Sequence, residues 1–136
     1  MSITLNPYIV FDGNAEEAMN FYRDVFGGEL TLSRYGDLPE AGFGEDEASK
    51  VMHAMLVTPD GLTLMGADQP AGMEFRPGNT SSISLSGDDE AKLRAFWEGL
   101  SDGGQVQEPL TKAPWGDTFG MCLDRFSIGW MVNIAG

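Results

Sequence analysis

One helix pattern occurs twice in this chain, about 75 residues apart, and this repetition constrains the fold more than any other feature. The first copy begins after Asn14 and ends at Gly28, and the second begins after Asp89 and ends at Gly103. Each copy has apolar residues at positions i, i+3, i+4 and i+7, which is typical of an amphipathic helix. These residues are Ala18, Phe21, Tyr22 and Val25 in the first copy, and Leu93, Phe96, Trp97 and Leu100 in the second. A period this long exceeds that of solenoid repeats, so it predicts two copies of a module of roughly 65–75 residues.

Length, composition and charge exclude several classes of protein. With 136 residues, of which 42% are hydrophobic, the chain can bury an ordinary core. It lacks the run of about 18 apolar residues that a membrane span needs, and its first residues do not resemble a signal peptide. The net charge of -13 disfavours phosphate backbones and anionic lipid as partners, and a well-solvated acidic surface accounts for it. We expect no nucleic acid and no membrane as a partner.

The single cysteine, Cys122, cannot form an internal disulfide, which fits a reducing cytoplasm. It lies between Met121 and Leu123 in an apolar run, so we expect a buried small hydrophobe rather than a nucleophile. The sequence therefore predicts a cytoplasmic protein.

The order of strand and helix patterns is the same in both halves. Asn14 and Glu17 have the spacing of a capping box at the start of the first helix. Residues 36–49 read as a polar loop and residues 68–79 as a linker. The predicted strands cover 6–11, 29–35, 50–58 and 62–67 in the first half, and 80–86, 105–110, 118–123 and 129–134 in the second. We predict an α+β fold of two pseudo-symmetric βαβββ modules, at about 1–70 and 79–136, within one domain spanning 1–136.

Four segments are together similar to one known family. They are the opening residues 6–28, residues 51–54, the run Trp115-Gly116-Asp117, and residues 124–131. Together with the predicted pair of βαβββ modules, these segments resemble the PhnB-like branch of the vicinal oxygen chelate superfamily. That superfamily includes glyoxalase I, bleomycin-resistance proteins and extradiol dioxygenases. The resemblance covers nearly the whole chain. It implies a glyoxalase-like fold, in which the modules form a cupped mixed sheet with a central cleft for a metal or small ligand, and a homodimer.

The metal ligands of that superfamily do not reappear in this sequence. They are His, Glu or Gln side chains on the first and fourth strands of each module. Alignment of the two helices places these positions near Pro7, residues 64–66, Ser82 and Met131, none of which has an imidazole or a carboxylate. Zinc, nickel or iron needs three or four nitrogen or oxygen donors at about 2.0–2.2 Å. We therefore predict a cleft without a metal or another cofactor.

A methyltransferase activity, which members of the PhnB-like branch often carry as an inherited label, is also not expected. Most methyltransferases hold S-adenosylmethionine in a glycine-rich loop between a strand and a helix. Gly13, at the corresponding place, is a lone turn glycine. We reject that activity for this chain.

His53 is the only histidine and the candidate catalytic residue. Strand alternation places it on one face with Val51, Met55 and Val57. One interpretation is a core histidine held by one hydrogen bond; the other is a cleft histidine that acts as a ligand donor or general base. His53 with Asp68 or Asn133 would form a metal site in an alternative reading of the protein as a metal-dependent lyase, isomerase or dioxygenase.

The second half offers candidate ligand-binding residues on two strands. If Ile83 and Leu85 pack on the helix, the residues that alternate with them face the cleft. The candidates on these two strands are Ser82, Ser84, Met131 and Asn133. Such a face suits a small, partly polar ligand, and a solvent-exposed polar stripe is the alternative. Methionine side chains that face the cleft would form a lining that adapts to a ligand. For most of the methionines, however, a place in the hydrophobic core is the simpler interpretation. These are Met52, Met55, Met65, Met73, Met121 and Met131.

Trp115 lies in a loop with Pro114 and Gly116. A tryptophan at this place either closes over a ligand by stacking or anchors its loop to the core or to a second subunit. The leading prediction is a protein that binds a small organic molecule in a metal-free cleft. A third interpretation is a scaffold for protein contacts whose cleft is filled by side chains such as Trp115 and Phe119.

Overall fold

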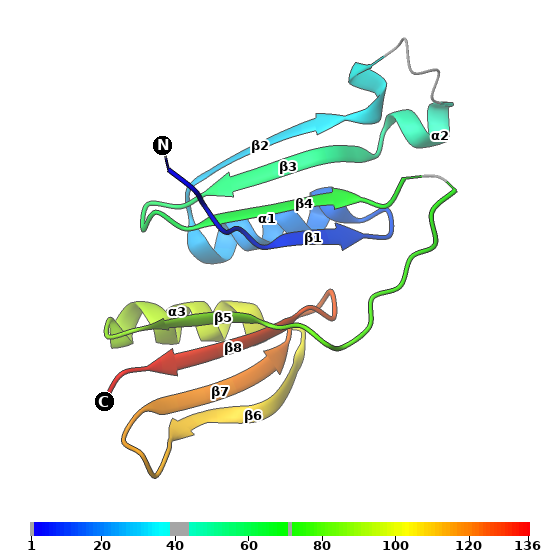
Figure 1. The fold of residues 1–136 in the computed structure, drawn as a ribbon. Coiled ribbons are helices and arrows are strands. Elements are labelled where there is room, and N and C mark those ends of the chain that lie inside the picture. Colours follow the sequence, from blue (N-terminus) through cyan, green and yellow to red (C-terminus); the bar gives the residue numbers. More distant parts are fainter. Residues whose placement is uncertain (1, 39–43, 71) are drawn as a thin grey trace. The chain divides into compact units, whose positions relative to one another are not determined.

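The structure is a computed structural model and describes residues 2–38, 44–70 and 72–136. It divides into two compact units, Met1–Pro77 and Gly78–Gly136. Each unit has a four-stranded sheet with one long helix packed against it (Figure 1). The first unit consists of β1 (Tyr8–Phe11), α1 (Ala15–Phe26), β2 (Glu29–Arg34), the short 3₁₀ helix η1 (Tyr35–Asp37), α2 (Glu45–Ala48), β3 (Val51–Val57) and β4 (Thr63–Asp68). The second unit consists of β5 (Ile83–Gly87), α3 (Glu90–Ser101), β6 (Gln105–Lys112), β7 (Thr118–Leu123) and β8 (Gly129–Ile134).

The predicted α+β fold with a repeated βαβββ order is confirmed. The strand orders are β1-β4-β3-β2 and β5-β8-β7-β6, so the two sheets have the same topology. In each, the first strand of the unit pairs in parallel with the last, and the other pairs are antiparallel. The boundary at Pro77 lies within the predicted linker. A single domain spanning 1–136 stays a prediction.

The two long helices form where the repeated pattern predicts them, because their apolar stripes are buried. In α1 the predicted residues Ala18 and Tyr22 are fully buried, whereas Phe21 and Val25 are half-buried. In α3 all four predicted residues are buried. The predicted burial of Cys122 on β7 is also confirmed, and burial raises the pKa of its thiol to about 11. In the described part of the chain, no helix has both the length and the apolar character that crossing a membrane requires.

The two helices begin differently, and the prediction of a capping box at the start of α1 is wrong. Asp89 caps α3 by accepting a hydrogen bond from the backbone N–H of Lys92 at 3.2 Å. Asn14 makes no such side-chain bond to α1. Its place is taken by Asp68, at the end of β4, which accepts from the N–H of Ala15 at 2.8 Å. A residue distant in sequence thus satisfies one of the unpaired N–H groups of the first turn.

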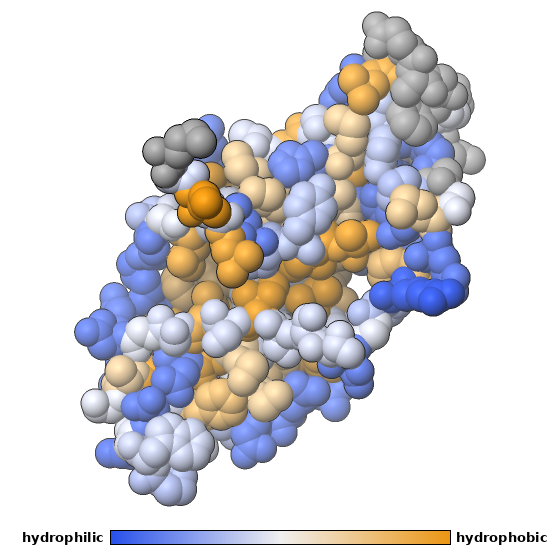
Figure 2. All heavy atoms as spheres, viewed as in Figure 1, coloured by the Kyte–Doolittle hydropathy of each residue, from blue (hydrophilic) through white to orange (hydrophobic). Residues whose placement is uncertain are grey.

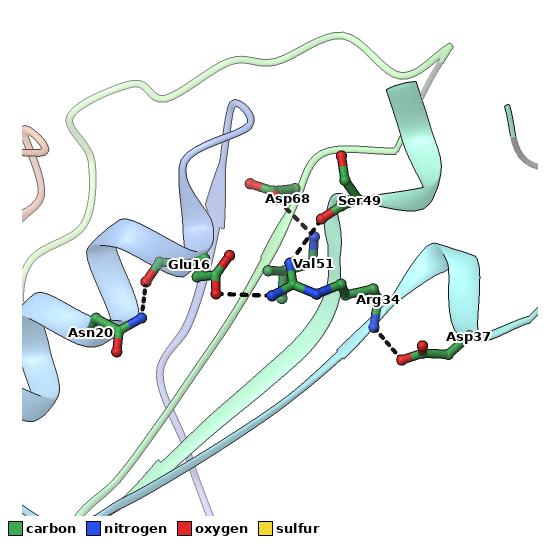
Figure 3. A network of polar contacts seen from close by, with 7 residues as sticks. All are labelled: Glu16, Asn20, Arg34, Asp37, Ser49, Val51 and Asp68. Atoms are coloured by element: carbon green, nitrogen blue, oxygen red, sulfur yellow. Dashed lines mark hydrogen bonds and ion pairs between the residues drawn. The ribbon is translucent and has the colours of Figure 1, made fainter. Parts of the chain in front are cut away.

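Asp68 also fixes the start of β3, beside a network that ties α1 to β2 (Figure 3). Its second carboxylate oxygen accepts from the N–H of Val51 at 2.8 Å. Arg34, the last residue of β2, donates to the Ser49 carbonyl and to the Glu16 carboxylate, both at 2.9 Å. The side chain of Asp68 is 2% exposed. The start of α1 and the start of β3 therefore share one buried acceptor.

The predicted polar loop over 36–49 is only partly a loop. Its beginning belongs to η1 and its end to α2, and the N–H of Tyr35 donates to the Lys50 carbonyl at 3.1 Å. Residues 39–43 of that prediction lie outside the described residues. The two strands flanking the insertion are thus bridged at its base.

A β-bulge in β3 changes the face of the sheet on which one residue lies. β2 pairs Ser33 with His53 but Arg34 with Val51, so one extra residue of β3 lies between the two pairs. The bulge places Val51, which is 1% exposed, on the side of α1. The prediction that Val51 shares a face with His53 is therefore wrong.

Candidate functional site

The first sheet has one face covered by α1 and one face that α1 leaves uncovered, which we call the open face of the first sheet. Residues on the helix side, such as Ile9 and Leu56, are buried. Strand alternation and the pairing register place one row of side chains on the open face: Tyr8, Met65, Met55 and Thr31, on β1, β4, β3 and β2. Figure 1 shows α1 behind β4 and β1, and Figure 2, drawn from the same side, shows hydrophobic side chains along these strands.

His53 lies on this open face and contacts Tyr8. The hydroxyl oxygen of Tyr8 is 3.2 Å from Nδ1 of His53, and the two ring centroids are 5.7 Å apart with an interplanar angle of 32°. Tyr8 belongs to β1 and His53 to β3, so the pair spans the intervening strand β4. Tyr8 is 50% exposed and His53 is half-buried. His53 is therefore a half-buried side chain of the sheet face with Tyr8 as a polar partner.

Burial raises the pKa of Tyr8 above its ordinary value. Tyr35, at the end of the same sheet, is buried and donates its hydroxyl to the Asp68 carbonyl at 3.3 Å. Its pKa is raised mainly by burial, with a smaller contribution from Tyr8. Both phenols therefore keep their protons throughout the physiological pH range and serve as hydrogen-bond donors.

The second sheet repeats this arrangement on the face away from α3, its own open face. Ser84 pairs with Met131, and Met131 pairs with Met121. Ile83 and Leu85 pair with the buried Trp130 and Val132, as expected for the helix side. The methionine pair Met121–Met131 therefore occupies the same register position as Met55–Met65 in the first sheet. All four methionines are half-buried.

Asn133 is on the open face of the second sheet, but its side chain already has a partner. Its Nδ2 donates to Asp117 at 3.0 Å, and the other oxygen of Asp117 accepts from the N–H of Gly136 at 3.0 Å. The bond from Asn133, and then that from Gly136, lowers the pKa of the Asp117 carboxyl. The carbonyl oxygen of Asn133 remains the part of this amide that suits a ligand donor.

Trp115 is at the turn between β6 and β7 and is 69% exposed. The turn is closed by a hydrogen bond from the N–H of Ala113 to the Asp117 carbonyl at 2.6 Å. This exposure contradicts anchoring to the core, one of the two anchoring alternatives predicted for Trp115, while anchoring to a second subunit stays a prediction. Such exposure is compatible with stacking on a ligand or packing on a second subunit.

The remaining sequence candidates have different surroundings. Ser82 is exposed and precedes β5, while Ser84 lies within that strand. Asp68 is buried, with both carboxylate oxygens occupied by backbone N–H groups. A ligand would have to displace one of these bonds to reach the carboxylate. We therefore do not keep Asp68 in the proposed site.

The residues that face away from the helices do not fit the metal site of the superfamily. On the first and fourth strands of each unit these residues are Tyr8, Val10, Thr63, Met65 and Ala67, then Ser84, Ser86, Gly129, Met131 and Asn133. Catalytic zinc, nickel and iron sites are built from imidazole and carboxylate groups, and none of these residues has either. Among the described residues, no three His, Cys, Asp or Glu side chains cluster so as to hold a metal ion.

Tyr8 is the site residue that the sequence did not single out. The alignment of the repeats places the first-strand position near Pro7, whereas the structure places Tyr8 on the open face. The alternation of Tyr8 and Val10 with the buried Ile9 and Phe11 is the signal that identifies it. Its contact with His53 depends on a pairing across β4 that no local pattern contains.

Comparisons with known proteins agree with this architecture. Residues 4–132 match the model of the glyoxalase/bleomycin resistance protein/dioxygenase superfamily. The crystal structure of protein PA1353 from Pseudomonas aeruginosa is 36% identical, with a TM-score of 0.86 and 98% of each chain covered. A Bacillus cereus PhnB protein, named as a candidate 3-demethylubiquinone-9 3-methyltransferase, is 26% identical, with a TM-score of 0.76, and covers 98% of this chain and 100% of its own.

A curated relative extends the similarity. Protein YjdN of Escherichia coli K12 is 24% identical over an alignment of 142 positions, which covers 96% of this chain and 94% of that protein. The similarity to the Bacillus cereus PhnB protein agrees with the predicted resemblance to the PhnB-like branch. From the match over residues 4–132, with the same fold in two close structures, the chain belongs to the glyoxalase/bleomycin resistance protein/dioxygenase superfamily.

Proposed function

We propose that this protein binds a small organic molecule on the open faces of its sheets, without a metal. The observation that carries the proposal is the neighbouring placement of a polar pair, Tyr8 and His53, and a methionine pair, Met55 and Met65, on one uncovered face. Ligand sites are mostly apolar with a few placed polar groups. Methionine side chains adapt to the shape of a ligand because they are unbranched and polarizable.

The second sheet supplies a second set of the same kind. Met121 and Met131 provide the adaptable apolar part, and Ser84 and Asn133 provide polar groups. Trp115 adds an exposed aromatic ring. In the scaffold interpretation, Trp115 would fill a cleft, and its 69% exposure does not support that interpretation.

Replacing the methionine pairs tests the proposal. With N-phenyl-1-naphthylamine, an uncharged fluorescent probe, we expect binding at the first sheet of the wild type that weakens at least about tenfold in Met55→Gln/Met65→Gln, because each buried apolar side chain contributes about 1 kcal/mol or more to such a contact. The same loss is expected at the second sheet in Met121→Gln/Met131→Gln. Fluorescence titration gives the affinities.

Met73→Gln is the matched control. Met73 is 63% exposed and lies outside the strands of both sheets, so the same chemical change there should leave probe binding unchanged. Unaltered probe binding in both double variants, with the fold intact by circular dichroism, would contradict the proposal.

A metal-dependent lyase, isomerase or dioxygenase is the alternative. It would use His53 with Asp68 or Asn133, but Asp68 already accepts two backbone hydrogen bonds and Asn133 donates to Asp117. Stoichiometric metal that survives dialysis and disappears in His53→Ala would favour this alternative over the metal-free proposal.

Other parts of the function follow from the sequence. The lone turn glycine Gly13 argues against a methyltransferase, and the -13 net charge argues against nucleic acid and membrane partners. A cytoplasmic location rests on the single, buried Cys122.

We also infer a homodimer, formed through an apolar patch at one end of the first sheet. Ile3 is 98% and Leu5 99% exposed, immediately before β1. Val57 and Leu62 are 43% and 40% exposed, at the turn between β3 and β4. Because β1 runs parallel to β4, these residues lie at the same end of the sheet (Figure 1). A second copy has the same patch, so a two-fold contact would cover both.

Light scattering after size-exclusion chromatography tests the dimer. The wild type is expected at twice the chain mass of 14.7 kDa, and Ile3→Ser/Leu5→Ser at the mass of one chain. Trp115→Ser, which removes an exposed aromatic residue elsewhere, should remain dimeric. A variant Ile3→Ser/Leu5→Ser that stays dimeric would refute this interface.

A further inference from the structure

The contact between Tyr8 and His53 determines more than the position of two side chains. A neutral imidazole has one nitrogen that donates and one that accepts, and the partner of one nitrogen decides which is which. Here the partner of Nδ1 is the phenolic hydroxyl of Tyr8, at 3.2 Å. The direction of this bond therefore sets what the other nitrogen, Nε2, offers to a ligand.

The phenol is the better donor of the two groups, and the imidazole nitrogen is the better acceptor. A phenol has a reference pKa of about 10, and an imidazole nitrogen binds a proton with a pKa of about 6.5, far more readily than a phenolic oxygen does. Burial further favours the protonated phenol. The stable arrangement at neutral imidazole is Tyr8 Oη–H donating to Nδ1, which leaves the proton of His53 on Nε2.

The surroundings of the pair then limit the ligand. Met55 and Met65 make the same face apolar, so the ligand needs an apolar body. An N–H donor selects an acceptor atom, such as a carbonyl or carboxylate oxygen. The chain has a net charge of -13, which disfavours an anion over an uncharged molecule. An uncharged carbonyl compound satisfies all three conditions.

We propose that Tyr8 holds His53 as the Nε2–H tautomer, and that His53 thereby donates a hydrogen bond to the carbonyl oxygen of an uncharged organic ligand. The ligand part of this inference rests on the proposed function, whereas the tautomer part does not. Tyr8 acts here as a positioning residue, and His53 is the residue that touches the ligand.

Long-range proton–nitrogen correlation spectra of the 15N-labelled protein test the tautomer. Because His53 is the only histidine, one imidazole pattern is observed. For the neutral imidazole we expect a protonated Nε2 and an unprotonated Nδ1. Tyr8→Phe keeps the ring but removes the hydroxyl, so both nitrogen shifts should move toward averaged values.

Tyr35→Phe is the control for the tautomer. The Tyr35 hydroxyl donates to the Asp68 carbonyl, so its removal should leave the His53 pattern unchanged. A wild-type spectrum with a protonated or averaged Nδ1, or a spectrum unaffected by Tyr8→Phe, would overturn the inference.

Two probes of the same shape test the ligand class. Acetophenone has a carbonyl oxygen where α-methylstyrene has a methylene group. We expect acetophenone, but not α-methylstyrene, to shift the Nε2–H resonance, and His53→Phe to weaken acetophenone binding about fivefold, the value of one neutral hydrogen bond. An equal response to both probes, or none to either, would overturn the carbonyl assignment.

These measurements separate the two proposals. Probe binding at the methionine faces together with an averaged His53 tautomer would support the proposed function and contradict this inference. A fixed Nε2–H tautomer without any probe binding would support the role of Tyr8. It would contradict both the proposed function and the carbonyl ligand.

Discussion

Asp68→Ala is expected to lower the free energy of unfolding by about 3–6 kcal/mol, because it removes two hydrogen bonds to a carboxylate that are worth about 1.5–3 kcal/mol each. The carboxylate accepts from the N–H groups of Ala15 and Val51, both at 2.8 Å, and is 2% exposed. In the variant, two buried donors lose this acceptor. Urea unfolding monitored by circular dichroism measures the loss.

Two further variants define the cause of the Asp68 effect. Asp68→Asn keeps one acceptor oxygen, so its loss of stability should be smaller than that of Asp68→Ala. Asp12→Ala removes an exposed aspartate just before α1 and should change stability by less than about 0.5 kcal/mol. If Asp68→Ala were as stable as Asp12→Ala, the buried carboxylate would not hold the starts of α1 and β3.

The role of Asp68 illustrates which parts of the fold can be predicted from sequence. The pattern of α1 is local, since its apolar residues lie within one helix, and the prediction of that helix is confirmed. The acceptor at its first turn is not local. Asn14 has the right residue type at the right place, yet Asp68, 53 residues from Ala15, makes the bond. Sequence patterns predict what an element is, whereas its long-range partners depend on the tertiary structure.

In the candidate site, too, local features were predictable from the sequence and long-range contacts were not. Alternation predicts that Ile83 and Leu85 turn toward the helix and Ser84 away from it, and the register with β8 agrees. Alternation fails at Val51, because a bulge adds one residue to β3. It also gives no sign of the contact between Tyr8 and His53, which bridges two strands separated by β4. That the faces bind a ligand stays a prediction.

Asp124, in the turn between β7 and β8, is the other buried carboxylate whose removal should lower the free energy of unfolding strongly. Asp124 is 3% exposed, and one of its oxygens accepts from the N–H groups of Phe126 at 2.8 Å and Ile128 at 3.1 Å. The other oxygen accepts from the indole Nε1 of Trp130 at 2.9 Å. Trp130 is 2% exposed. Asp124→Ala removes the acceptor of all three donors, and at about 1.5 kcal/mol or more for each bond to a carboxylate we expect a loss of at least about 4.5 kcal/mol in urea unfolding.

The corresponding turn of the first unit suggests a substitution that separates the contribution of the turn bonds of Asp124 from that of its bond to the indole. In the turn between β3 and β4, Thr58 accepts from the N–H of Leu62 at 3.1 Å, the bond that Asp124 makes to Ile128 in the second unit. Asp124→Thr should therefore keep the turn but lose the indole bond, because the threonine side chain is shorter and places its only oxygen in the turn.

A double-mutant cycle isolates the bond to the indole. Trp130→Phe removes the indole donor, so in that background the further change Asp124→Thr should cost about 1.5–3 kcal/mol less than it does in the wild type. Equal costs in both backgrounds would mean that Asp124 stabilises only its own turn. A smaller cost beside Phe would instead show that this carboxylate joins the β7–β8 turn to the buried face of the second sheet.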